Sequence, residues 1–251
     1  MRTDPFTDLA RSPGGVPQHA LGHRRLWSLD ALSRRDVQTL LDGARAIERA
    51  AHSAAPCRVL RGMNIARLCE GVADAAAEAF DRAATELGAQ VTHIRPSESR
   101  LTEAGDAKRT AGMLGRLYDA IDCSGLPNES LLAIEREAGV PVFNGLAAGE
   151  HPVRVLAELL ALQALGQRPL DTLSVRFAGA ASSARERALS QAAALAGIGW
   201  QTPVATPARE ADFEFGDDDT LRTASGAIVD RAIVADSRRH VLQALLVGSL
   251  G

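Results

Sequence analysis

Residues 68–88 read LCEGVADAAAEAFDRAATELG, a segment that joins the end of a buried strand to a helix. The apolar run 63–69 predicts the strand, residues 74–87 predict the helix, and Gly88 is typical of the position after a helix end. In α/β proteins such a turn often binds an anion, because backbone N–H groups and the positive end of the helix dipole meet there. Here the turn offers alanines and two carboxylates, Glu70 and Asp74. We therefore expect Asp74 to cap the helix that follows it.

Strands and helices alternate on both sides of this segment at the spacing of βαβ units, which predicts parallel sheets. The acidic stretch 210–219 is expected to be a solvated loop. The other expected helices cover residues 33–51, 107–117, 130–138, 152–165, 183–196 and 237–250, and the other expected strands cover residues 89–94, 120–124, 140–144, 172–178, 200–205 and 227–234.

The predicted fold class is α/β, with two Rossmann-like domains joined by long helices. Each domain is expected to hold a parallel sheet flanked by helices, and the second domain is truncated. We expect a mobile N-terminal arm in residues 1–25 and a first domain in residues 26–150. Residues 151–251 are expected to form the shortened second domain, including a C-terminal helix.

The composition is ordinary for a soluble globular protein, with 46% hydrophobic and 24% charged residues. A net charge of −3 argues against a nucleic-acid-binding protein, and no apolar run is long enough to span a membrane. The three cysteines, Cys57, Cys69 and Cys123, form no CxxC pair, which favours a reducing compartment. We therefore expect a cytoplasmic protein without a metal site, a cofactor, a nucleic-acid partner or a membrane partner.

Four segments of the chain carry further information: LWSLDALSRRDVQTLLDGA (26–44), VPVFNGLAAGEHPVRVLAELLAL (140–162), LSVRFAGAASSARERALSQAAALAGIGWQTPVATP (173–207) and SRRHVLQALLVGSL (237–250). These segments, in the correct order, resemble the aspartate/ornithine carbamoyltransferase family, and its ornithine branch in particular. The resemblance covers nearly the whole chain from about residue 24. It implies a protein that transfers a carbamoyl group from carbamoyl phosphate to an amine.

The resemblance also places the substrate site of the family, and this sequence departs from it. The family carries Ser-Thr-Arg-Thr-Arg where this chain has alanines and one aspartate. A further family arginine falls on Ser124, and the glutamine of the His-Pro-x-Gln motif falls on Arg154, whereas the histidine is retained as His151. The departing residues of the phosphate loop are Ala73, Asp74, Ala75, Ala76 and Ala77.

These departures predict a large loss of affinity for carbamoyl phosphate. A hydrogen bond to a charged group contributes about 1.5–3 kcal/mol, so three lost arginine contacts cost roughly 4–9 kcal/mol. That energy corresponds to about three to six orders of magnitude in affinity. The carboxylate of Asp74 would also repel the phosphate. The amino-acid site is affected separately, because the His-Cys-Leu-Pro and Ser-Met-Gly segments of the family have no counterpart in residues 207–237.

The leading interpretation is a carbamoyltransferase-like protein that is non-catalytic and acts as an oligomeric scaffold or as a regulatory paralogue. The resemblance implies a homotrimer, with a hetero-assembly with an active carbamoyltransferase as a further possibility. One alternative is a transferase of the family that uses Ser124, His151 and Arg154 on a different substrate. Another alternative is a small-ligand sensor that uses the cleft between the domains.

Three residues of these segments have a structural as well as a functional interpretation. His151 either donates to a ligand carbonyl or caps its helix locally. Arg154 either contacts an anion while facing Asp74 or forms an ion pair between elements. His240 matches a histidine of the terminal segment of the family and is expected to be structural.

Overall fold

The computed structural model describes residues 28–51, 58–69, 75–95, 107–146, 148–149, 151–201 and 210–250. Several expectations fall outside these residues: the N-terminal arm, and the side chains of Cys57, Glu70, Ala73 and Asp74. The helix expected after Asp74 begins at Ala75.

The first sheet has four parallel strands in the order β2-β1-β3-β4, as the spacing of strands and helices predicts. The sheet is built around β1, whose residues Ile65 to Leu68 are all buried. Its strands are β1 (Asn64–Leu68), β2 (Gln90–Ile94), β3 (Ala120–Cys123) and β4 (Val142–Phe143). Its helices are α3 (Ala75–Glu86), α5 (Ala107–Leu117) and α6 (Asn128–Ala138).

The second sheet also has four strands, in the order β6-β5-β7-β8, and only the β7–β8 pair is antiparallel. The helix α8 (Ala184–Ala196) lies between β5 and β6 in the sequence. The strands are β5 (Ser174–Phe177), β6 (Gly199–Gln201), β7 (Phe213–Phe215) and β8 (Leu221–Thr223). The α/β fold class with two sheets is thereby confirmed.

Two expectations for the second half of the chain are wrong, the first of them only in part. The acidic stretch 210–219 is a solvated loop only in part. Residues 213–215 form β7, in which Phe213 and Phe215 are buried and which pairs with β5 in the middle of the sheet, whereas residues 217–219 lie in an exposed turn. Residues 227–234 do not form a strand. Ile228 makes only an isolated bridge to Arg222, and the terminal helix begins at Arg231 rather than at residue 237.

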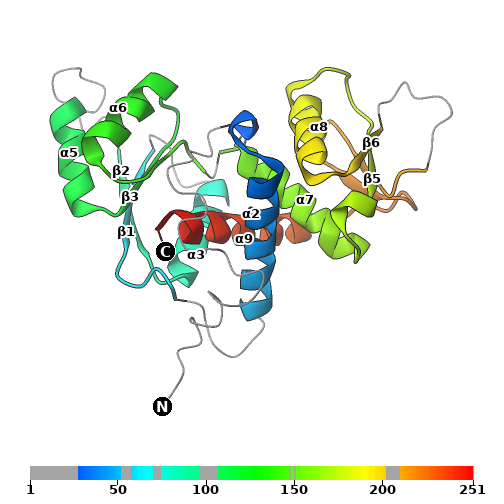
Figure 1. The fold of residues 1–251 in the computed structure, drawn as a ribbon, viewed down its shortest axis with the longest axis horizontal. Coiled ribbons are helices and arrows are strands. Elements are labelled where there is room, and N and C mark those ends of the chain that lie inside the picture. Colours follow the sequence, from blue (N-terminus) through cyan, green and yellow to red (C-terminus); the bar gives the residue numbers. More distant parts are fainter. Residues whose placement is uncertain are drawn as a thin grey trace, which may run out of the picture.

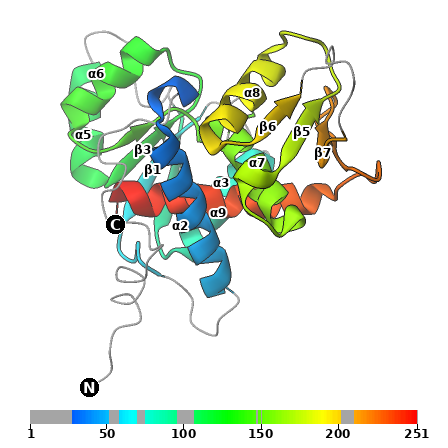
Figure 2. The ribbon, with the colours of Figure 1, turned by 45° about the vertical axis from the view of Figure 1, so that its right-hand side comes forward.

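Three helices lie between the two sheets and form the centre of the molecule (Figures 1 and 2). They are α2 (Arg34–Ala51), α7 (Pro152–Gly166) and α9 (Arg231–Leu250). The last helix packs against α2, α3 and α7, so the end of the chain lies beside the first sheet. Most of the hydrophobic core is one continuous cluster that runs through these helices into both sheets. The domain boundary expected at residue 150 stays a prediction.

The start of α2 shows how local sequence sets these elements. The backbone N–H of Asp36 donates to Ser33 Oγ (3.3 Å), and the carboxylate of Asp36 accepts from the backbone N–H of Ser33 (2.8 Å). This reciprocal arrangement is a capping box, which satisfies N–H groups that a helix leaves unpaired at its start. Val37, Leu40, Leu41 and Ala44 then place one apolar face in the core.

Candidate functional site

The carboxyl ends of β1, β3 and β4 lie at one edge of the first sheet, because these strands are parallel. The strand order reverses between β1 and β3. The chain runs from β1 to β2 on one side of the sheet, and then crosses back to β3 and β4 on the other side of β1. Ligands of open α/β sheets bind in the crevice at such a switch point. The structure therefore places the end of β1, Ser124 and the start of α7 around the position where a ligand is expected.

Ser124 is held in this edge by its backbone. Its N–H donates to the carbonyl of Leu68 (3.0 Å), which ties the end of β3 to the end of β1. Gly145, in the segment after β4, has a φ of 62°, and a Cβ on it would lie 2.8 Å from Ser124 Oγ. The segment after β4 thus packs directly on Ser124 and needs glycine at this point.

A buried cluster of charged side chains lies beneath the carboxyl edge of the first sheet. The sequence alone does not indicate this cluster. Asp122 on β3 is completely buried and lies opposite Arg67 on β1, with 3.6 Å between Arg67 Nε and Asp122 Oδ2. Arg67 also approaches Asp81 (3.6 Å), which contacts His93 (2.8 Å). Burial raises the pKa of the Asp122 carboxyl, and the N–H of Leu146 (3.0 Å) and the Arg67 guanidinium oppose that rise.

His151 is the N-cap of α7. The ring is 5% exposed, and its Nδ1 accepts from the backbone N–H of Val153 (3.2 Å). Pro152 is the first residue of the helix, where a missing N–H costs nothing. The structure gives His151 the local capping contact that sequence analysis considered as an alternative to ligand binding.

The start of α3 is uncharged at the described positions where the resemblance expects arginine. Ala75 is the first helical residue, and Ala77 is 5% exposed on the same turn. Ala73 and Asp74 lie outside the described residues, so the cap expected from Asp74 is a prediction. A position of Arg154 facing Asp74 is not described for the same reason, whereas the alternative, an ion pair between elements, is observed with Asp219.

Arg154 belongs to a network of four charges that joins α7, α8 and the β7–β8 turn. It pairs with Asp219, and its Nε lies 3.7 Å from Glu158 Oε1. Arg185, on α8, donates to Glu158 Oε1 (3.0 Å) and lies 3.4 Å from Asp219. Burial raises the pKa of the Glu158 carboxyl, and the two arginines oppose that rise. Two cations and two carboxylates therefore compensate each other.

This network borders a pocket of about 400 Å³ that is lined mainly by α7, α9 and the β7–β8 turn, with one residue of α3. Arg154, Glu158 and Asp219 form one side of the pocket, and the first half of α9 forms another. The α9 side adds two further arginines: Arg231, which is exposed, and Arg238, which donates to the carbonyl of Ala148 (3.0 Å). This pocket is where a small molecule could contact both halves of the chain.

At the carboxyl end of β5, in the second sheet, side-chain oxygen atoms accept hydrogen bonds from backbone N–H groups. After β5, the N–H of Ala180 donates to Asp217 (2.6 Å) and the N–H of Ser182 donates to Glu186 (3.1 Å). Ser183 Oγ accepts from the N–H of Glu186 (3.0 Å) and so caps α8. Three of the backbone N–H groups that an anion could use in this turn, those of Ala180, Ser182 and Glu186, are thus already bonded.

Cys123 is a structural residue at the carboxyl edge of the first sheet. Its side chain is completely buried at the end of β3, and burial raises the pKa of its thiol to about 12. The thiolate is the nucleophilic form of cysteine, so a thiol with this pKa is unreactive at neutral pH.

Comparison with known proteins identifies the origin of this architecture. Residues 24–164 match the family model described as aspartate/ornithine carbamoyltransferase, carbamoyl-P binding domain. The match covers more than half of the chain. The chain belongs to the aspartate/ornithine carbamoyltransferase family. Residues 68–88, the β1–α3 segment, lie inside the matched region.

Two curated relatives within the family support this assignment. The catabolic ornithine carbamoyltransferase of Pseudomonas putida is 36% identical over 157 residues, which are 62% of this chain and 47% of the relative. The ornithine carbamoyltransferase of Actinobacillus pleuropneumoniae is 36% identical over 159 residues, which are 63% of this chain and 48% of the relative. The chain thus spans about half the length of the curated relatives it matches.

Solved structures of the family share the fold over almost the whole chain. The ornithine carbamoyltransferase of Burkholderia thailandensis aligns with a TM-score of 0.71 and 17% identity, covering 90% of this chain and 98% of that one. The aspartate transcarbamoylase of Trypanosoma cruzi aligns with a TM-score of 0.70 and 14% identity, covering 94% of this chain and 99% of that one. Among the described residues, no helix has the length and apolar character needed to cross a membrane.

Proposed function

We propose that this member of the carbamoyltransferase family does not transfer a carbamoyl group, and that it acts as a non-catalytic oligomeric scaffold or as a regulatory partner of an active carbamoyltransferase. The observation that carries the proposal is the charge balance beside the pocket. Arg154 and Arg185 are paired with Glu158 and Asp219, so this network offers no net positive charge to a phosphate.

Two further observations support the proposal. Ala75, Ala77 and Ser124 stand where the resemblance expects arginines, and Ala77 is buried. His151 uses Nδ1 to cap α7, which leaves the retained histidine with a structural task. Prearranged donors that stabilise developing charge usually supply more of an enzyme's rate enhancement than any other single effect, and these substitutions remove donors of that kind.

The first test is an assay of carbamoyl transfer. We expect no citrulline or carbamoyl-aspartate above background with ornithine or aspartate at millimolar carbamoyl phosphate. An active ornithine carbamoyltransferase serves as the positive control. The double variant Ala75→Arg/Ala77→Arg is also expected to stay inactive, because the amino-acid segments are missing as well. Turnover by the unmodified chain would overturn the proposal.

The second test is the state of association. We expect a homotrimer, or a larger assembly of trimers, because the resemblance implies that association runs through the first domain. Multi-angle light scattering at micromolar concentration measures this directly. A monomer would remove support for the scaffold. Co-purification with an active carbamoyltransferase would then decide whether a regulatory partnership remains.

The pocket favours one second candidate function, a sensor of a small anionic ligand. Beyond the balanced network of Arg154, Arg185, Glu158 and Asp219, the pocket is lined by Arg231 and Arg238, which add positive charge on its α9 side. Calorimetric titration with small carboxylates and with inorganic phosphate distinguishes this function, because a scaffold would bind none of them. The transferase alternative with Ser124, His151 and Arg154 would instead give turnover with another amine.

A further inference from the structure

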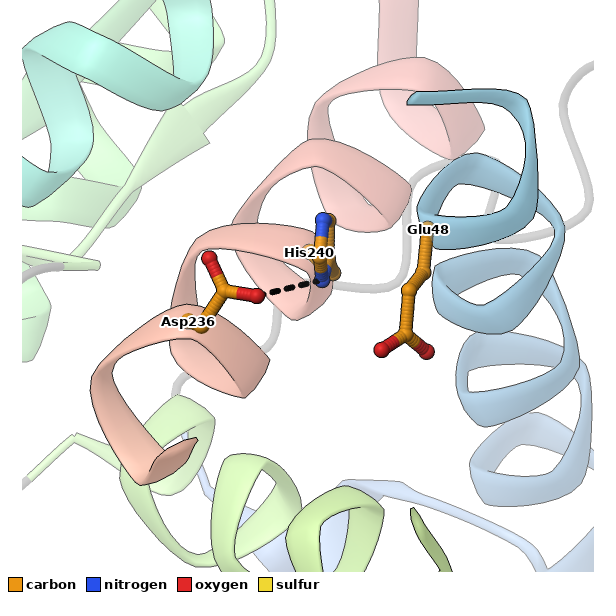
Figure 3. Close-up of side chains that lie close together, drawn as sticks. All are labelled: Glu48, Asp236 and His240. Carbon is orange, nitrogen blue, oxygen red and sulfur yellow. Dashed lines mark ion pairs between the residues drawn. The ribbon is translucent and has the colours of Figure 1, made fainter. Parts of the chain in front are cut away.

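Three side chains that are far apart in the sequence lie together where α2 meets α9. Asp236 and His240 are one turn apart on α9, and Glu48 reaches toward them from α2 (Figure 3). One possible metal-ligand atom from each residue lies within 4.8 Å of the other two. The cluster is on a different part of the molecule from the β1–α3 edge and the pocket beside Arg154.

His240 distinguishes this cluster from a group of acidic side chains, because its imidazole is buried and not hydrogen-bonded within the described part of the chain. The residue is 1% exposed, and neither of its ring nitrogens has a hydrogen-bond partner among the described residues. Its Nδ1 faces Asp236 Oδ2 at 4.0 Å, which is too far for a hydrogen bond (Figure 3). Buried polar groups are nearly always bonded, so an imidazole in this position requires an explanation, and a bound ion is one.

The cation beside Asp236 does not occupy Oδ2, the carboxylate oxygen that faces His240. Arg239 pairs with Oδ1 of Asp236 and also donates to Glu86 (2.5 Å), which directs it away from Oδ2. The side chain of Asp236 is 51% exposed, and Glu48 borders a pocket of about 460 Å³ that α2 shares with α7. An ion can therefore enter from solvent, which a credible metal site requires.

We propose that Glu48, Asp236 and His240 bind a divalent transition-metal ion, Zn²⁺ above all, and that the ion links α2 to α9. One imidazole nitrogen and two carboxylate oxygens suit Zn²⁺, whereas Mg²⁺ and Ca²⁺ prefer oxygen alone. Zn²⁺ holds such ligands at about 2.0–2.2 Å, so tetrahedral donors lie about 3.3–3.5 Å apart. Side-chain rotation of Asp236 and Glu48 has to close the remaining distance, and water completes the fourth position.

The sequence contains only part of this site. Asp236 and His240 have the i, i+4 spacing that places two ligands on one face of a helix. Glu48 comes from the other end of the chain, and no sequence spacing links it to α9. Cysteine and histidine spacing, which predicts no metal site, carries no information on such long-range pairs.

The test is calorimetric titration of the untagged full chain with ZnCl₂. We expect one equivalent to bind, and we expect Asp236→Asn and Glu48→Gln each to weaken binding at least tenfold. Asp42→Asn is the matched control, because Asp42 is an exposed carboxylate of α2 that pairs with Arg45 outside the cluster. The control is expected to bind Zn²⁺ like the unmodified chain.

Three further measurements decide between a built site and an adventitious ion. His240→Gln should abolish binding, and Co²⁺ should give the visible spectrum of a site with nitrogen and oxygen ligands. Saturating Zn²⁺ should raise the melting temperature by about 5 °C in the unmodified chain and in Asp42→Asn only. Absence of binding to the unmodified chain, or equal binding by Asp236→Asn and Asp42→Asn, would overturn the proposal. Because Asp236 and Glu48 are at least partly exposed, their variants carry the test even if His240→Gln fails to fold.

Discussion

Replacement of Gly115 by alanine is expected to lower the free energy of unfolding by about 3 kcal/mol or more. Gly115 lies on α5 where this helix crosses α6. A Cβ on Gly115 would lie 2.6 Å from the carbonyl carbon of Ala138 and 2.7 Å from its Cα, and closer still to its carbonyl oxygen. These are backbone atoms, so no side chain can rotate away, and the two helices have to separate.

Gly112 provides the matched control one turn earlier on the same helix. A Cβ there would meet only the carbonyl oxygen of Glu137, at 3.6 Å, which is an ordinary contact. Gly112→Ala is therefore expected to be neutral or to stabilise the protein by up to about 1 kcal/mol, because alanine favours the helix. Urea unfolding of both variants measures the difference. Equal stability of the two variants would mean that α5 and α6 do not cross as closely as the structure shows.

Much of the fold could be predicted from the sequence because its signals are local. The helix expected at residues 33–51 is observed as Arg34–Ala51, since the apolar period and the cap at Ser33 lie within a few residues of one another. The strand at residues 63–69 is observed as Asn64–Leu68, and Gly139 ends α6 in the left-handed conformation. Each of these features depends on neighbours along the chain.

The second sheet was predicted less well because charge hid the pattern of β7. Phe213 and Phe215 alternate with Glu214, which is the period of a half-buried strand, but the surrounding aspartates suggested a loop. Glu214 pairs with Arg176, its partner in the β5 register, and so its charge is compensated across the sheet. Only the tertiary structure shows that pairing.

The candidate site could be predicted only in part, again because some of its contacts form only in the tertiary structure. Ser124 and His151 were identified through the resemblance to the family, and the structure places both at the carboxyl edge of the first sheet. The pair of Arg67 with Asp122 was missed, and the ion pair of Arg154 was anticipated without its partners. Arg67 and Asp122 meet only because β1 and β3 are neighbours, and the partners of Arg154 lie on α7 and beside β8. Long-range pairing of charges leaves no signal in a single sequence.

The charge network beside the pocket leads to the second large expected effect, which concerns Arg185. Glu158 is 5% exposed, and its strongest described contact is the 3.0 Å hydrogen bond from Arg185. Removal of one partner of a buried ion pair typically costs about 3–5 kcal/mol, because the other charge stays buried without compensation. Arg185→Met is therefore expected to destabilise the chain by about 3 kcal/mol at pH 8.

The cost should depend on pH. Burial raises the pKa of Glu158, and loss of Arg185, which opposes this rise, raises the pKa further in the folded variant. The folded variant then binds more protons than the unfolded chain at pH values above the ordinary glutamate pKa. Its stability consequently falls as pH rises through the raised pKa and is fully present below the unfolded value. The destabilisation by Arg185→Met should thus be smaller near pH 5 than near pH 8.

Two companion variants separate the ion pair from the other contacts of Arg185, which also donates to the carbonyl of Gly216 (3.2 Å). The double variant Arg185→Met/Glu158→Met should recover more than half of the lost stability at pH 8, because no unpaired carboxylate remains and Arg154 keeps Asp219. Arg82→Met is the surface control, since Arg82 is 70% exposed and its pair with Glu86 is worth less than about 1 kcal/mol. Urea unfolding at both pH values compares the four proteins. An effect of Arg185→Met no larger than that of Arg82→Met, or equal at both pH values, would show that Glu158 does not depend on Arg185.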